Sequence, residues 1–146
     1  MIRPFALDDL DRILLIEHRS FPKSPYDGAT FVNLYYTYPG TFLVDAEPDP
    51  GRKEDRILGY IVFSTDGHII SIAVHPESRR RGIGRRLVER ALKASHTSKV
   101  WAEVRKSNQG AQAFYHELGF QVIGMVPDYY GNEEALIVQW TPGPGH

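Results

Sequence analysis

Cysteine does not occur anywhere in the 146 residues of this chain. Its absence excludes disulfides, a thiolate nucleophile and cysteine-ligated zinc. No apolar run approaches the ~20 residues that a helix needs to cross a bilayer, so we expect no membrane partner. The opening stretch, MIRPFALDDLDRILLIE, carries acids within its apolar part, unlike a signal peptide. We therefore expect a cytoplasmic protein.

An excess of either charge is also missing, because the formal net charge is −1. A nucleic-acid footprint over the whole molecule is thereby disfavoured, and we expect no nucleic-acid partner. Any anion site must be local. The histidines form no ligand pattern: His116 and Glu117 would need a second histidine at position 120, where Phe120 stands. We expect no metal.

The chain does have an ordinary hydrophobic share of 42%, which suits a folded globular protein. Its length fits a single domain over residues 1–140. The last residues, TPGPGH (141–146), offer nothing to pack, and we expect a flexible tail.

Helical periodicity and strand-forming runs alternate along the chain. Helices are predicted over residues 5–21 (with Asp8 or Asp9 as cap), 29–38, 84–95 and 108–120. Strands rich in β-branched and aromatic residues are predicted over 41–46, 57–64, 68–74, 99–105, 121–126 and 134–140. The order predicts a mixed α/β (α+β) fold built on one curved sheet.

The loop HPESRRRGIG stands between a predicted strand and a predicted helix. The first N–H groups of a helix lack internal partners and attract anions, and glycine lets the backbone approach a phosphate closely. Two phosphate motifs fail here. A P-loop would need Lys-Ser/Thr after Gly84, and a dinucleotide fingerprint would need Gly or Ala at Leu87. The pattern that survives is R-x-x-G-x-G, from Arg79 through Gly82 to Gly84.

This loop lies in IAVHPESRRRGIGRRLVERAL, which resembles the acetyl-CoA loop of the GNAT superfamily of N-acetyltransferases. IRPFALDDLDRILLIE resembles the family's opening strand and helix, and EVRKSNQGAQAFYHELGFQVIG its later strand–helix–strand block. Together the motifs span Ile2 to Trp140. AEVRKSN, FYHELGF and DYYGNEEALIV are most similar to ribosomal-protein-alanine acetyltransferases and to archaeal and eukaryotic protein N-terminal acetyltransferases.

The resemblance implies a mostly antiparallel curved sheet with about four helices and with central strands splayed at an acetyl-CoA site. It implies an acetyl-CoA-dependent N-acetyltransferase without a metal. The residues that it assigns to the cofactor are Ile72, Ala73, Val74, Arg79, Arg80, Arg81, Gly82, Ile83, Gly84, Arg85, Asn108 and Tyr115. The acceptor implied is a protein or peptide N-terminus, a ribosomal protein being one candidate. Monomer and homodimer both stay open.

Two residues match the family's catalytic positions. Glu103 alternates with Ala102 and Val104 along its strand, so it faces away from them. The resemblance makes Glu103 the base and Tyr115 the acid beside the cofactor sulfur. A solvent-facing strand acid and a half-buried core aromatic are the plain alternatives. His68 stands where some relatives carry a catalytic tyrosine, and it is a secondary candidate beside the substrate.

Two aromatic loops resemble substrate-binding loops of the family. Phe21, Pro22 and Tyr26 would shape the pocket for the acceptor's first residue, and Tyr129 and Tyr130 would bind the acceptor backbone. Tyrosines on loops also serve as simple lids over a core.

Other functions stay open at this level. Acids of the DYYGNEE segment could attract a lysine side chain or a polyamine instead of an α-amine. A non-catalytic acetyl-CoA-binding domain would keep the loop without the chemistry. An RNA-binding module would use the arginine run together with the paired tyrosines. The leading interpretation is a protein N-terminal α-acetyltransferase.

Overall fold

The computed structural model describes residues 1–23 and 25–141. The strands are β1 (Ile2–Pro4), β2 (Phe42–Glu47), β3 (Arg56–Phe63), β4 (Ile69–Val74), β5 (Val100–Arg105), β6 (Gln121–Val126) and β7 (Ala135–Trp140). The α-helices are α1 (Leu10–Ser20), α2 (Gly28–Thr37), α3 (Ile83–Ala94) and α4 (Gln109–Glu117), with short 3-10 helices over Leu7–Asp9 and Pro76–Ser78. The tail predicted to be flexible lies, from residue 142 on, outside the described residues.

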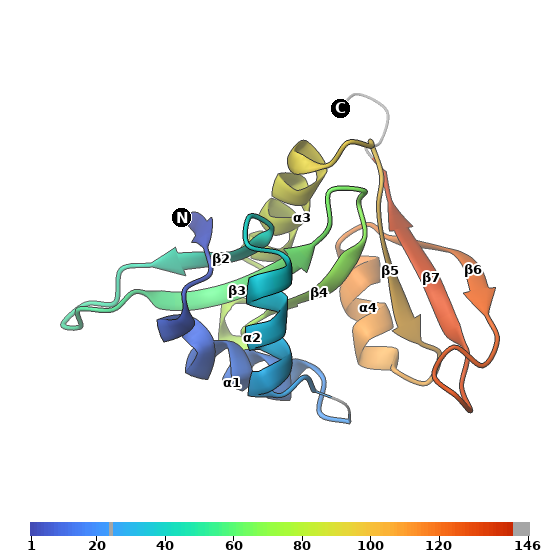
Figure 1. The fold of residues 1–146 in the computed structure, drawn as a ribbon, viewed down its shortest axis with the longest axis horizontal. Coiled ribbons are helices and arrows are strands. Elements are labelled where there is room, and N and C mark those ends of the chain that lie inside the picture. Colours follow the sequence, from blue (N-terminus) through green and yellow to red (C-terminus); the bar gives the residue numbers. More distant parts are fainter. Residues whose placement is uncertain (24, 142–146) are drawn as a thin grey trace.

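The strands form two sheets, where the periodicity had predicted one (Figure 1). One sheet has four strands in the order β1-β2-β3-β4, and the other has three in the order β5-β7-β6, with every pairing antiparallel. An isolated parallel bridge between His68, just before β4, and Trp101 of β5 joins the two sheets. The prediction of one continuous sheet was therefore wrong at this junction, whereas the mixed, mostly antiparallel fold with splayed central strands is confirmed.

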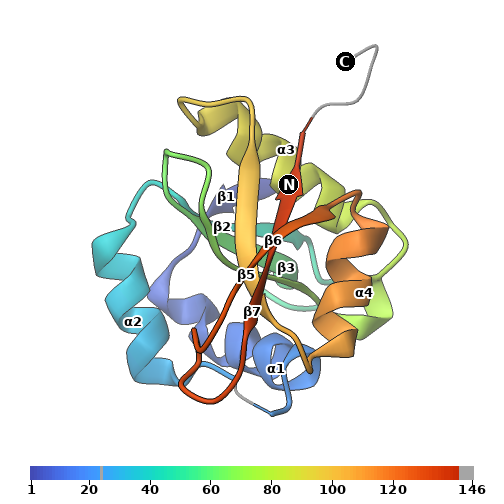
Figure 2. The same cartoon turned by 90° about the vertical axis from the view of Figure 1, so that its right-hand side faces the viewer.

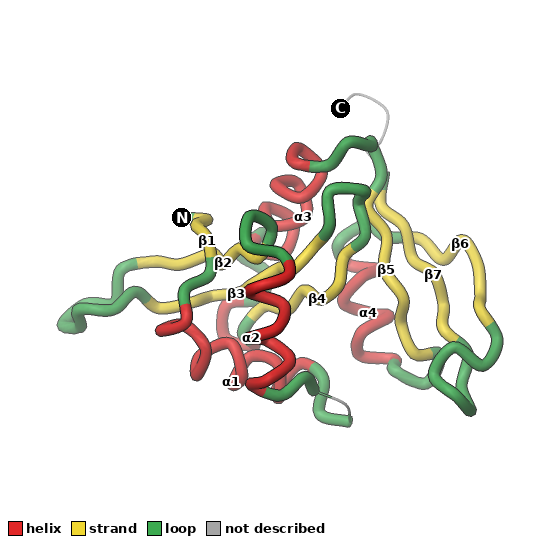
Figure 3. Tube along the Cα trace, in the orientation of Figure 1, coloured by secondary structure: helices red, strands yellow, loops and turns green. Residues whose placement is uncertain are grey.

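Helices cover both faces of the four-stranded sheet (Figure 3). Ile13 and Ile16 of α1 and Phe31 of α2 pack with Tyr60 on one face. Leu87 and its α3 neighbours fill the opposite face, in a cluster that continues into α4 and the three-stranded sheet. Burying both faces of β3 explains why its sequence, RILGYIVF, is apolar almost throughout.

One local prediction needs correction. Asp9 does precede α1, but its carboxylate does not cap that helix. It accepts hydrogen bonds from the Ala6 N–H (2.9 Å) and from the Arg3 guanidinium (2.9 and 3.0 Å) instead. The strand β6 forms as predicted, yet it lies at the edge of its sheet with all six residues exposed, Val122 to 59%. The local sequence pattern predicts that these residues form a strand. Whether the strand lies at the edge of its sheet depends on the order of the strands, which the local pattern does not determine.

The junction between the sheets depends on Gly67. This residue has φ +96°, and a Cβ added to it would lie 2.2 Å from the Lys99 carbonyl oxygen. Its own carbonyl accepts a hydrogen bond from Trp101 N–H at 2.9 Å. Only glycine allows the two strands to meet here.

We expect Gly67→Ala to lower the free energy of unfolding by more than ~2 kcal/mol, because it combines an unfavourable φ with a backbone collision. The matched control is Gly131→Ala, at φ +87° with open space around it. That change should cost only the backbone strain, about 1–2 kcal/mol. Urea denaturation of both variants measures the difference, and equal losses would show that the junction does not need glycine.

Candidate functional site

The site lies where β4 and β5 separate. After the bridge at His68, the two strands diverge toward Val74 and Arg105, and α4 lies beside the opening (Figures 1 and 2). Buried backbone groups need hydrogen-bond partners, so a strand edge without a neighbouring strand is suited to a ligand. Three neighbouring cavities follow this opening.

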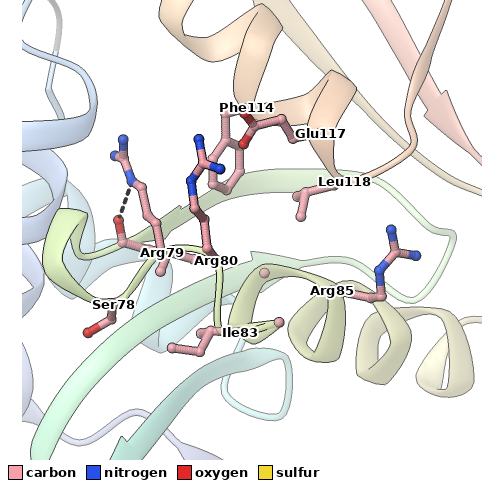
Figure 4. A pocket seen from close by; sticks show the side chains of 11 residues that line it. Ser78, Arg79, Arg80, Ile83, Arg85, Phe114, Glu117 and Leu118 are labelled. Atoms are coloured by element: carbon pink, nitrogen blue, oxygen red, sulfur yellow. Dashed lines mark hydrogen bonds between the residues drawn. The ribbon is translucent and has the colours of Figure 1, made fainter.

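The first cavity, about 410 Å³, lies at the glycine loop (Figure 4). Gly82 precedes α3 with φ +76°, and Arg80 also has a left-handed backbone with φ +65°. This conformation places the free N–H groups of the α3 N-terminus at the cavity, which makes an anion site. The lining residues are Val74, Ser78, Arg79, Arg80, Gly82, Ile83, Gly84, Arg85, Phe114, Glu117 and Leu118.

Gly84 has a second role that the sequence did not reveal. A Cβ at this position would lie 2.8 Å from Cδ2 of Leu118, at the end of α4. The missing side chain therefore lets the start of α3 pack closely against α4, in addition to leaving the backbone accessible.

The arginine side chains divide into two groups. Arg80 and Arg85 line the cavity (Figure 4). Arg81 instead donates to Glu47 at 2.9 Å, and Arg86 donates to the buried Asp45 at 2.9 Å. The two β2 acids thus hold the outer side of the loop. Arg81, with Arg56, lowers the pKa of Glu47 to about 2. The sequence prediction grouped Arg81 with the anion site, but Arg81 does not line the cavity, and its side chain is held by Glu47.

A second cavity of about 370 Å³ continues the first along β4 and shares Arg79 and Phe114 with it. Ile72 and Ala73 line it, opposite the start of α4. Asn108 also lines it and caps α4, its Oδ1 accepting from Ala111 N–H at 3.0 Å. The predicted cofactor residues Ile72, Ala73, Val74, Arg79, Arg80, Gly82, Ile83, Gly84, Arg85 and Asn108 therefore line one continuous path.

A third cavity of about 220 Å³ ends this path on the side of β5 and contains Glu103, Tyr115, Tyr26 and Tyr130. Phe21 and Asn108 line both the second and the third cavity. Of the predicted acceptor residues, Pro22 lines the second cavity rather than the third. Tyr129 lines none of the three cavities and is 49% exposed, but it lies near enough to Glu103 for this carboxylate to raise its pKa.

Glu103 projects from β5 on the face opposite Ala102 and Val104, as the alternation predicted. Its Oε2 lies 2.8 Å from Nε2 of His68, and the two side chains are 15% and 25% exposed. The imidazole stacks on Trp101, with ring centroids 4.1 Å apart and planes at 8°. An ionised Glu103 accepts from this fixed imidazole, so the bridge that joins the sheets also orients a carboxylate.

Four tyrosines lie around the Glu103 carboxylate, and its negative charge helps to raise the pKa of each. Burial is the main cause that raises the pKa of Tyr129, and the Glu103 charge is the second. For Tyr130, burial together with the nearby Tyr129 and Glu103 raises the pKa to about 12. Burial also raises the pKa of Tyr26 and, well above the usual range, of Tyr115, with Glu103 again adding to both. All four hydroxyls are therefore protonated at neutral pH.

The loop between β6 and β7 is fixed by charge. The Arg105 guanidinium carbon lies 4.2 Å from the centroid of the Tyr130 ring. Glu133 accepts from Arg105 at 3.2 Å and from Ser107 N–H at 3.0 Å, and Lys106 lies 3.2 Å from Glu134. Two of the acids that could have attracted a cationic acceptor are thus paired within the protein.

Sequence reasoning missed Glu17, which lines the third cavity together with Ser71 and is only 2% exposed. A signal was present: Glu17 follows Ile13 by four residues and adjoins Ile16, so it occupies the apolar face of its helix.

Among the described residues, no group of histidines and acids is arranged to hold a metal, and no helix is long and apolar enough to span a membrane.

Sequence comparisons relate the chain to acetyltransferases along nearly its whole length. An uncharacterized N-acetyltransferase of Methanocaldococcus jannaschii is 35% identical over 97% of this chain and 92% of its own. An N-alpha-acetyltransferase of Sulfurisphaera tokodaii is 32% identical, with the same coverage of both chains. A putative ribosomal protein bS18-alanine N-acetyltransferase of Bacillus subtilis is 30% identical over 96% of this chain and 93% of its own.

Among solved structures, Naa20 of Chaetomium thermophilum in complex with a bisubstrate analogue superposes with a TM-score of 0.76. It is 27% identical, with 97% of this chain and 86% of that chain covered. The family model for the acetyltransferase (GNAT) family matches residues 8–120. The chain therefore belongs to the GNAT family, and it is an N-acetyltransferase.

Proposed function

We propose that this enzyme transfers the acetyl group of acetyl-CoA to the α-amine at a protein N-terminus. The observation that carries the proposal is the position of Glu103. It lies beside His68 at the point where the path from the glycine loop reaches the tyrosine-lined cavity. The relatives named as N-alpha-acetyltransferases support the same acceptor.

The residues along the path fit acetyl-CoA. The α3 N-terminus with Arg80 and Arg85 would hold the diphosphate, and the edge of β4 from Ile72 to Val74 would bind the pantetheine arm. The cofactor supplies an activated acetyl thioester. Residues 1–140 would form one catalytic domain.

The base requirement for this reaction is modest. A peptide α-amine has a pKa near ~8, whereas a lysine amine has one near ~10.4. Glu103 would accept the amine proton directly or through one water, and His68 would keep the carboxylate oriented. Tyr115 would donate its proton to the departing thiolate, because burial keeps this phenol protonated.

The paired acids of the β6–β7 loop favour an α-amine over a lysine or polyamine acceptor. Glu133 and Glu134 are engaged by Arg105 and Lys106, so they do not offer a free anionic surface. The N-terminus of a ribosomal protein that begins with alanine is one acceptor within this proposal, supported by the relative from Bacillus subtilis. Acetylation of a peptide with a free α-amine, measured against the same peptide N-blocked but carrying lysine, tests the acceptor. Preference for the blocked peptide would refute it.

Glu103→Gln should lower turnover of the free-amine peptide by roughly 10²–10⁴, because the amide cannot accept the amine proton. The amide keeps the shape and can still contact His68, so the affinity for acetyl-CoA should be unchanged. Steady-state kinetics and calorimetry measure the two effects. Wild-type turnover in this variant would remove Glu103 from the mechanism.

Replacing Arg80 and Arg85 together by alanine should weaken acetyl-CoA binding about 10- to 100-fold, with a shallower salt dependence, because two cations at the diphosphate are lost. Arg81→Ala is the single-charge control. It removes one cation, adjacent to Arg80 in the sequence and four residues before Arg85, from a side chain held by Glu47, and should change the affinity less than ~3-fold. An equal effect per charge removed would show that total charge, not side-chain direction, governs binding.

The proposed role of Tyr115 leads to a prediction for turnover at alkaline pH. An ordinary tyrosine titrates near ~10, but burial raises the pKa of Tyr115 well above that value. The protonated acid is present below the folded-state pKa, so turnover should not fall between pH 8 and 10 through loss of this proton. Tyr115→Phe should lower turnover roughly 10²-fold at every pH in this range. A fall in wild-type turnover centred near pH 10 but missing in the variant would contradict the raised pKa.

A further inference from the structure

A chain of hydrogen bonds joins the acceptor loop, described over residues 21–23 and 25–27, to the strand β4. Glu17 Oε2 accepts from Tyr26 N–H at 2.9 Å, and Oε1 accepts from the Tyr60 hydroxyl. The Tyr60 oxygen lies 2.9 Å from Oγ of Ser71. Since Tyr60 has one proton and gives it to the carboxylate, Ser71 must donate to Tyr60. The chain therefore runs from Ser71 on β4, through Tyr60 on β3, to Glu17 on α1 and the backbone of the loop.

The position of this chain of hydrogen bonds is unusual for contacts that are purely structural. Glu17 is 2% exposed and, among the described residues, forms no ion pair. Burying a carboxylate without a cation costs free energy, and an apolar residue would pack here more cheaply. Glu17 and Ser71 both line the third cavity, as does Tyr26, whose backbone the carboxylate holds. The chain thus connects both walls of the cavity in which Glu103 lies.

We propose that Glu17 is the positioning residue of the acceptor site: it holds the acceptor loop at a fixed place relative to β4. The inference rests on the proposed function, since it concerns where the acceptor amine meets the acetyl group. Charge-assisted hydrogen bonds from a backbone N–H and a phenol are stronger than neutral ones, which explains a carboxylate at this point. Burial raises the pKa of Glu17, opposed by these two hydrogen bonds.

The kinetic consequence follows from pre-organisation. If the loop loses its anchor, only a fraction of the molecules presents a formed acceptor cavity. The acceptor must then order the loop when it binds, so its apparent affinity falls by that fraction, whereas a saturating acceptor still yields the ordered complex. A merely structural role would instead reduce the amount of active enzyme, lowering kcat with KM unchanged.

The test uses variants of the full chain with acetyl-CoA and a free-amine peptide. Glu17→Leu keeps the volume but removes both hydrogen bonds, and it should raise the peptide KM about 10-fold, with kcat and the acetyl-CoA affinity within ~2-fold. Glu17→Gln can accept from Tyr26 N–H and donate to Tyr60, so its KM should stay within ~3-fold of the wild type. Tyr60→Phe, which loses only a hydroxyl, should raise KM ~3- to 10-fold and covers the case in which Glu17→Leu fails to fold.

Two further measurements separate positioning from stability. Amide exchange at Tyr26 should accelerate in Glu17→Leu and stay slow in Glu17→Gln. Ile13→Val, a buried change on the same helix away from the cavity, should lower stability but leave the peptide KM unchanged. An unchanged KM in both Glu17→Leu and Tyr60→Phe overturns the inference, and so does a loss in Glu17→Gln as large as in Glu17→Leu. A wild-type enzyme that does not acetylate the peptide would instead refute the proposed function.

Discussion

The divergence of β4 from β5 is the constraint on which the rest of the structure depends. The strands meet at His68 and Trp101 and then separate, so the facing edge of β4 has no ladder from β5 over the described residues. Backbone groups along such an edge need other partners, and in this protein they line a path that starts at the α3 N-terminus and ends at Glu103. The same contact stacks the His68 ring on Trp101, which fixes the partner of the carboxylate. Opening the sheet and orienting Glu103 are therefore one structural event.

Most elements of the fold could be predicted because their signals are local. The helix α3 follows from a 3.6-residue period, its start from Gly82, and the outward direction of Glu103 from strand alternation. The gap in the sheet could not be seen, since it depends on the strand order and on how Gly67 meets Lys99. Pairing partners far apart in sequence leave no periodic trace in a single chain. The family resemblance supplied the splay that periodicity alone had missed.

The arginine-rich loop shows the same limit at the level of side chains. The sequence places positive charge beside two glycines, which indicates an anion site. It does not reveal that Asp45 and Glu47 on β2 form salt bridges with Arg86 and Arg81, respectively. Arg86 also donates to the carbonyl of Arg81 at 3.1 Å. Arg81 and Arg86 thus hold the loop from outside, while Arg80 and Arg85 line the cavity. Only the tertiary contacts distinguish the two pairs.

The two carboxylates of the acceptor cavity are suited to different tasks by their contacts. Each oxygen of Glu17 accepts a hydrogen bond from a group that is fixed in the fold, one of them a backbone N–H. A proton taken up there would have to displace one of these contacts. Glu103 is more exposed than Glu17, and the hydrogen bond to one of its oxygens comes from the His68 imidazole. The proposed base would gain and lose a proton in every turnover, which suits the more exposed carboxylate, whereas a carboxylate that holds a loop needs fixed partners on both oxygens. The fold provides one carboxylate of each kind.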